Sequence, residues 1–426
     1  MVSCQMTNYE DVNLYMEGDG STQTLRIELV STLTNVNHAL GDRIRAFDEE
    51  QRNIDVHLVS NNDIYSNLSP WVIGLEGRGT PPDMIETTYN QIQNMYHHGK
   101  IEPLYINDPD LQDYVIKASD GEVIGIKAKV NPLLVYYNEY IFDAMGIEKP
   151  AGDWDWAMLD NTIEALKNAG HKAHIMLSPF TLEWLTMNRY DGRISAPDHL
   201  RFGGYLDSEA AVRAAEWFAW VGTKKEDFRY PRQHPFPMPH VMIDDQAAIA
   251  IDYAYRFFND YNYERIIEHN DQVNIAPLLG GPDTVNIAQM TGFAILSSSP
   301  NKDAAMKLLR YLMEESENYV HDIALYSMQA WAGLKVADEI NPERYSIVVR
   351  EIERSVPASL FMADDHTAGF NINALYPYLK EIIDGGSAPE ALKKYADEVD
   401  SEFSIFWEYP DAYGECIRGG RKFCVH

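Results

Sequence analysis

The chain has 426 residues, and its 65 acidic against 35 basic side chains give a formal net charge of −30 at pH 7. A surface this negative repels nucleic-acid phosphates and anionic lipids, which argues against binding to either. The hydrophobic fraction of 45% and the aromatic fraction of 12% are typical of a folded globular protein. No apolar run reaches the length of about 18 residues that a membrane-spanning helix needs.

The first part of the chain predicts a βαβ unit. Residues 24–32 alternate as a strand, residues 38–50 carry apolar side chains at helical spacing, and residues 53–60 alternate again. The two strands should therefore be parallel. The turn after the first strand lacks the G-x-G-x-x-G pattern of a dinucleotide site, so we expect no such cofactor.

The middle of the chain predicts a short buried strand at 84–85, a helix that ends at Gly99, and a β-hairpin over 114–128 with an Asp-Gly turn. A second apolar strand covers 133–137 and stops at Asn138.

A short helix should follow this strand and end at Gly146, and a longer helix should open at Asp153 or Asp155. Later segments mix strands and helices, and Ser387 opens a capping box for a late helix. The later predicted elements are helices at 155–170, 180–190 and 208–221, a strand that becomes a helix over 244–261, and a strand–turn–strand–helix unit over 273–315. Strands and helices that are intermixed in this way predict an α/β fold.

Four segments resemble the extracellular solute-binding proteins of bacterial ABC sugar importers, the family-1 type. The clearest reads GEVIGIKAKVNPLLVYYNEYIFDAMGIEKPAGDWDWAML, with a Tyr-Tyr-Asn strand, a helix, a glycine and a tryptophan turn. The others are PPDMIETTYNQIQNMYHHGKIEPL, TGFAILSSSPNKDAAMKLLRYLMEE and ALYPYLKEIIDGGSAPEALKKYADEVDSEF. The C-terminal stretch 404–426 and the region around SMQAWAG depart from the family pattern.

The resemblance implies a two-lobed, type II periplasmic-binding-protein-like fold, in which each lobe is a mixed, mostly parallel sheet flanked by helices. Hinge strands join the lobes, and a ligand lies in the cleft between them. The expected N-terminal lobe is 20–130 plus 275–325, and the expected C-terminal lobe is 131–274 plus 326–426. Tyr136 and Tyr137 would then lie where the chain crosses between lobes, more as hinge core than as ligand contacts.

A sugar offers apolar faces to aromatic rings and hydroxyl groups to polar side chains, and these two kinds of residue select the candidates. The polar and aromatic positions near the expected strand ends are Asn35, Asn37, His38, Glu86, Thr88, Tyr89, Asp252, Tyr253, Tyr255, Gln289 and Thr291, with Met290 between the last two. Trp331 is a candidate stacking platform, and the resemblance implies that the region of Trp184 lines the second lobe's side of the cleft. Other interpretations stay open: helix capping for the first three, exposed turn positions for the next three, and core packing for Trp184 and Trp331. Trp156 belongs to a helix stripe, which favours packing.

The three cysteines bear on the cell compartment. Cys4, in Met-Val-Ser-Cys, resembles the lipidated cysteine at the end of a lipoprotein signal, which predicts a bacterial cell-surface lipoprotein. Cys416 and Cys424 bracket a short glycine-containing loop that a disulfide could close. Three free thiols are the alternative.

The function predicted from the resemblance is a non-catalytic, monomeric receptor that binds a carbohydrate, preferably an oligosaccharide, and delivers it to the transmembrane subunits of an ABC permease. A glycoside hydrolase is one alternative, although nominating two acids among 65 carries no information. A receptor for a peptide or polyamine is another. The histidine pairs His97-His98 and His171/His174 lack the further ligands of a zinc site, so we expect no metal and no cofactor.

Overall fold

The architecture was analysed in a computed structural model of the chain. The described residues are 23–29, 39–51, 53–60, 82–107, 109–151, 154–169, 174–177, 180–197, 201–221, 242, 247–254, 272–280, 284–314, 323, 341–359 and 372–408. No helix within these ranges is long and apolar enough to cross a membrane.

One twisted sheet runs through the molecule in the order β2-β1-β3-β9-β5-β7-β6, with β10 paired to β9 and with β4 and β8 paired to β5. The strands are β1 (Gln23–Leu29), β2 (Ile54–Ser60), β3 (Met84–Thr88), β4 (Val115–Lys117), β5 (Val123–Asn138), β6 (His174–Leu177), β7 (Ala247–Tyr253), β8 (Val273–Ala276), β9 (Asn286–Ile295) and β10 (Ser355–Pro357).

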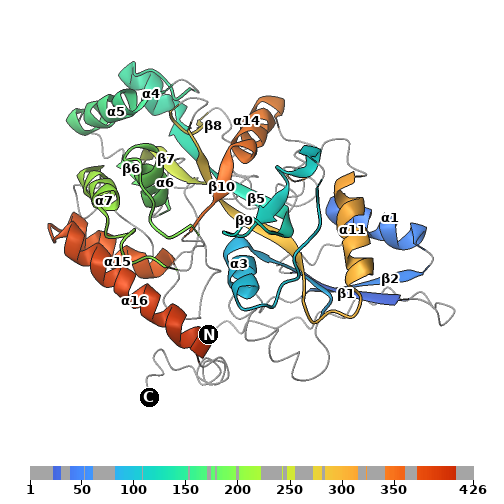
Figure 1. Ribbon diagram of the computed structural model, residues 1–426. Helices are drawn as coiled ribbons and strands as arrows, with labels where there is room; N and C mark the ends of the chain where they lie inside the picture. Colours follow the sequence, from blue (N-terminus) through green and yellow to red (C-terminus); the bar gives the residue numbers. More distant parts are fainter. Residues whose placement is uncertain are drawn as a thin grey trace, which may run out of the picture.

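Helices cover this sheet in two groups, one at each end (Figure 1). Those nearer the N-terminal strands are α1 (Ala39–Glu50), α3 (Tyr89–His97) and α11 (Lys302–Glu314). Those at the other end are α4 (Glu139–Met145), α5 (Trp156–Asn168), α6 (Thr181–Asn188), α7 (Glu209–Val221), α15 (Ile372–Ile383) and α16 (Ala388–Glu408). Helix α14 (Pro342–Glu353) lies beside the middle of the sheet, and a short 3-10 turn covers Pro109–Leu111.

The predicted βαβ unit is confirmed. Strand β1 pairs in parallel with both β2 and β3, and α1 connects β1 to β2. The apolar side chains Ile44 and Phe47 of α1 are 2% and 1% exposed, as their helical spacing predicts. The predicted hairpin is also present as antiparallel β4 and β5.

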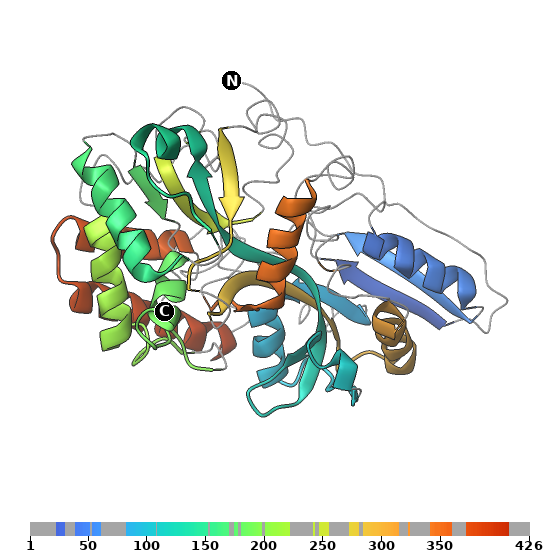
Figure 2. The same ribbon diagram turned by 90° about the horizontal axis from the view of Figure 1, so that it is seen from above.

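Strand β5 differs from the prediction because it is one continuous strand instead of two. Its first half pairs with β4 and β9, and its second half pairs with β7 and β8. A register shift between Lys127 and Val130 interrupts the pairing with β9, and the partner changes to β7 after Pro132. Figure 2 shows β5 and β9 running through the middle of the molecule, between the two groups of helices.

The core is divided on either side of this crossing. The first core packs α1, β3, β9, α11 and α14 around Phe47, Phe293 and Leu308. The second core packs α4, α5, α6, α7, α15 and α16 around Phe142, Phe218 and Leu392. Tyr136 belongs to the first core and its neighbour Tyr137 to the second, because successive side chains of β5 point to opposite faces.

The sequence around 138–156 folds as its residue types predict. The Asn138 side chain accepts hydrogen bonds from the backbone N–H groups of Tyr140 and Ile141 at the start of α4. Gly146 ends this helix with a φ of 63°, a left-handed conformation that favours glycine. Asp155 caps α5 through the N–H of Met158, and Trp154 is 1% exposed. Packing and capping therefore account for this segment.

Gly292 lies where β9 closely approaches β5. A Cβ atom there would lie 2.6 Å from the carbonyl oxygen of Ile126 and 2.2 Å from Cδ1 of Ile116. We expect Gly292→Ala to lower the free energy of unfolding by about 1–3 kcal/mol, because a backbone oxygen cannot yield as a side chain can. Denaturant unfolding measures this loss. Gly99→Asn is the control, because Gly99 has a φ of 68° and open space around it, so a loss as large at Gly99 would contradict the packing explanation.

Candidate functional site

Five polar residues gather near the point where β5 changes partners, and we call them the polar seam: Glu86 of β3, Lys129 and Asn131 of β5, and Gln289 and Thr291 of β9. Four of them are buried, and Gln289 is half-buried. Glu86, Thr88, Gln289 and Thr291 are brought together because β3 and β5 both pair with β9, with Thr88 opposite Thr291 and Asn131 opposite Gln289. The seam therefore lies between the two cores.

Glu86 and Lys129 form the charged centre of the seam. The side chain of Glu86 is 0% exposed and that of Lys129 is 9% exposed, and Lys129 Nζ lies 3.0 Å from Glu86 Oε1. The Thr291 hydroxyl donates to Glu86 Oε1 at 2.8 Å and accepts the backbone N–H of Lys129 at 3.2 Å. A buried ion pair is tolerated when further hydrogen bonds satisfy its atoms, as Thr291 does here.

Amide groups make up the rest of the seam. Asn131 Nδ2 donates to Gln289 Oε1 at 2.8 Å. Amides both donate and accept hydrogen bonds, which suits the recognition of hydroxyl groups. Met290, between Gln289 and Thr291, is 1% exposed and belongs to the first core.

A second set of polar side chains, next to the seam, connects β9 to β5 and α14 through hydrogen bonds. The Asn286 amide accepts the N–H of Leu133 at 3.1 Å and donates to the carbonyl of Leu133 at 2.8 Å. Glu351 Oε2 accepts from both Asn286 Nδ2 and Arg354 Nε at 2.7 Å. Burial raises the pKa of the Glu351 carboxyl, while Arg354 and Asn286 act to lower it. The start of β9 is thus tied to β5 and α14.

Asp252 and Tyr253 continue from the seam into the second core. They lie opposite Leu134 and Leu133 of β5, and they are 5% and 1% exposed. The Tyr253 ring contacts Phe180, at the start of α6, with centroids 4.6 Å apart. Asp252 accepts the N–H of Tyr253 at 2.8 Å.

Thr88 and Tyr89 have local structural partners. Thr88 caps α3 by accepting the N–H of Gln91 at 3.3 Å, which is the capping that its residue type favours. The Tyr89 hydroxyl donates to the carbonyl of Lys117 at 3.3 Å. Burial raises the pKa of the Tyr89 hydroxyl, so it remains a donor at neutral pH.

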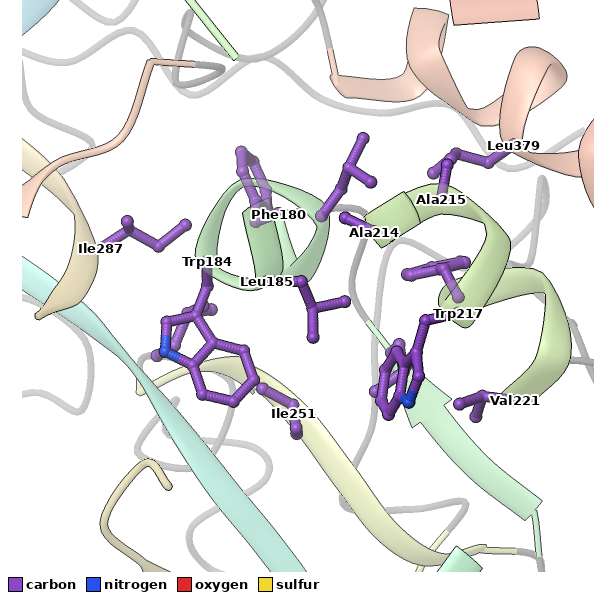
Figure 3. Packing of buried hydrophobic residues seen from close by; sticks show 14 of the residues in the cluster. Phe180, Trp184, Leu185, Ala214, Ala215, Trp217, Val221, Ile251, Ile287 and Leu379 are labelled. Carbon is purple, nitrogen blue, oxygen red and sulfur yellow. The ribbon is translucent and has the colours of Figure 1, made fainter. Parts of the chain in front are cut away.

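Trp184 lies inside the second core. It is 0% exposed, and its ring contacts that of Trp156 at 4.8 Å between centroids. Figure 3 shows its indole among Ile251, Ile287 and Leu185. Core packing, one of its two interpretations, describes this position, and a sugar contact at Trp184 stays a prediction.

The remaining candidates lie outside the described residues. They are Asn35, Asn37, His38, Tyr255 and Trp331, together with Cys4, Cys416 and Cys424. Their proposed roles stay predictions.

The sequence interpretation missed Lys129 and Asn131, although a signal was present. Lys127, Lys129 and Asn131 alternate along one face of a strand that is otherwise apolar. Polar side chains at alternate positions of a buried strand indicate a polar contact inside the protein.

Comparisons with known proteins agree with the fold described above. A family model described as bacterial extracellular solute-binding protein matches residues 59–319. No curated protein matches the chain.

Several solved structures share the architecture at low sequence identity. The sugar-binding protein MalE of Xanthomonas citri is 15% identical with a TM-score of 0.66, covering 91% of this chain and 100% of its own. An ABC substrate-binding protein of Listeria monocytogenes in complex with cycloalternan is 16% identical with a TM-score of 0.60, covering 90% of this chain and 99% of its own. A sugar transporter protein of Rhizobium etli in an open conformation is 14% identical with a TM-score of 0.60, covering 88% and 99%. The predicted two-lobed, type II periplasmic-binding-protein-like fold is confirmed.

Proposed function

This chain belongs to the bacterial extracellular solute-binding protein family, and from that membership we propose that it is a non-catalytic receptor for a carbohydrate. The ligand would be held between the two lobes and delivered to the transmembrane subunits of an ABC importer. Structures of the same fold are described with cycloalternan, maltose and maltotriose, which supports an oligosaccharide as the ligand class.

One observation carries the proposal: two buried carboxylates near the crossing strands already have partners inside the protein. Glu86 already has Lys129 and Thr291, and both oxygens of Glu183 accept the N–H of Ser359. A receptor for a polyamine needs carboxylates that are open to its ammonium groups. The paired charges and the amides of Asn131 and Gln289 favour a neutral ligand with many hydroxyl groups.

The proposed ligand contacts keep the predicted set. Glu86, Thr88, Tyr89, Gln289, Met290 and Thr291 would serve from the N-terminal lobe side, with Asn35, Asn37 and His38. Trp184, Asp252, Tyr253, Tyr255 and Trp331 would serve from the other side. The lobe boundaries at 130/131 and 274/275 are part of the same proposal. The boundary predicted at 325/326 is moved to the residues after β10, because Val348 and Ile352 of α14 belong to the first core.

We further propose that the receptor acts as a monomer on the outer cell surface, anchored through a lipidated Cys4. Membership of an extracellular family supports the location outside the cell. The Cys416–Cys424 disulfide would close the C-terminal loop.

Thermal unfolding against a ligand panel tests the proposal. The panel is maltose, maltotriose and cycloalternan, with spermidine, a tripeptide and free amino acids as controls. A ligand at 100 times its Kd should stabilise the chain by about 2.7 kcal/mol, which raises the midpoint by about 3 °C at this chain length. A shift with at least one sugar and none with the controls is expected. A shift with spermidine or the tripeptide alone would reject the carbohydrate assignment.

A further inference from the structure

The segment that follows β10 crosses between the lobes beside β9. Residues 355–357 pair in parallel with the first residues of β9, and Ala358 and Ser359 come next. In Figure 1, β10 lies between α6 of the C-terminal side and α3 of the N-terminal side. Residues 358–359 therefore form a third connection at the place where the lobes meet.

This connection is held from both lobes at once. From α3, Asn90 Nδ2 donates to the carbonyls of Ala358 at 3.2 Å and Ser359 at 2.9 Å. From α6, both carboxylate oxygens of Glu183 accept the N–H of Ser359, at 2.8 and 2.9 Å. Ser195 adds a hydrogen bond to the Ser359 hydroxyl at 2.7 Å.

Burial makes these contacts strong. Asn90, Glu183, Ser195 and Ser359 are between 2% and 6% exposed. A buried carboxylate is costly unless donors satisfy it, and a hydrogen bond to a carboxylate is about twice as strong as one between neutral groups. Glu183 is thus placed where losing its hold on Ser359 has a large effect.

We propose that Asn90, Ser359 and Glu183 form an interlobe clasp that sets the angle between the two lobes. Ser359 can be held by α3 and α6 together only while the first turns of these helices stay as close as they are in this structure. Opening the lobes about the hinge must release one of the two grips. Glu183 is a positioning residue in this scheme, and its effect on ligand binding rests on the receptor function proposed above.

The test uses the ligand-free full chain, so its outcome does not depend on whether any sugar binds. Small-angle scattering gives the radius of gyration of the wild type, Glu183→Ala and Asn90→Ala. Both variants should have a larger radius than the wild type. Their double variant should not expand further, because releasing either grip already opens the clasp. Hydrogen exchange at the Ser359 amide should become about ten-fold faster in Glu183→Ala, which has no side-chain acceptor for that N–H.

Thr186→Val is the matched control. Thr186 is also fully buried on α6, but its hydroxyl donates to Leu182 within the same helix at 2.8 Å. This variant should lose stability without any change in radius. Folded Glu183→Ala and Asn90→Ala variants with the wild-type radius would overturn the clasp. If Glu183→Ala does not fold, the Asn90→Ala variant decides the question alone.

Discussion

Replacing Lys129 with alanine is expected to lower the free energy of unfolding by about 3–5 kcal/mol, because the substitution leaves the Glu86 carboxylate buried without its cation. Glu86 is 0% exposed, so water cannot take the place of the ammonium group. Equilibrium denaturation measures the loss as a lower midpoint at an unchanged slope.

The exposed pair Lys393–Asp397 provides the control for this prediction. Its side chains are 62% and 61% exposed, one helical turn apart on α16, so Lys393→Ala should change stability by no more than about 0.5 kcal/mol. Replacing Glu86 and Lys129 together by Leu and Met should recover most of the loss, because no unpaired charge remains. A loss at Lys129 as small as that at Lys393 would show that the seam is open to solvent.

Replacing Trp184 with alanine is expected to destabilise the chain by about 3–5 kcal/mol, the cost of emptying a large buried site. The indole is fully buried and packs against Trp156. Thermal or denaturant unfolding measures the change. Trp220 is the control: it is half-buried on α7, where Lys167 covers its ring at 4.2 Å, so Trp220→Ala should cost about 1 kcal/mol.

The conservative variant Trp184→Phe separates packing from ligand contact. It keeps an aromatic ring in the core, so it should stay folded. If Trp184 only packs, the stabilisation by a bound sugar equals that of the wild type. Loss of the sugar-dependent shift in a stably folded Trp184→Phe would instead assign Trp184 to the binding site.

Local chemistry made much of the fold predictable. The spacing of Ile44 and Phe47, the Asn138 cap, the Gly146 stop and the Asp155 cap each act over a few residues, so they can be read without knowing the fold. Strand β5 was divided in the prediction because Pro132 and the polar residues before it look like an interruption. In the structure Pro132 lies opposite Ala288, at the change of partners.

The candidate site was less predictable because its contacts join distant segments. Glu86 was expected near the ligand, but its partners Lys129 and Thr291 are fixed only by the order of β3, β9 and β5. The hold of Glu183 on Ser359 spans 176 positions and depends on a third crossing that no local pattern marks. Strands β6 and β10 are four and three residues long, too short for a periodic signal.

Equilibrium titration with the panel sugar that gives the largest thermal shift, followed by analysis of the recovered sugar, tests the central claim most directly. The account predicts one sugar bound per chain and complete recovery of the sugar unchanged after long incubation. Shortened sugars or new reducing ends in the recovered fraction would contradict a non-catalytic receptor.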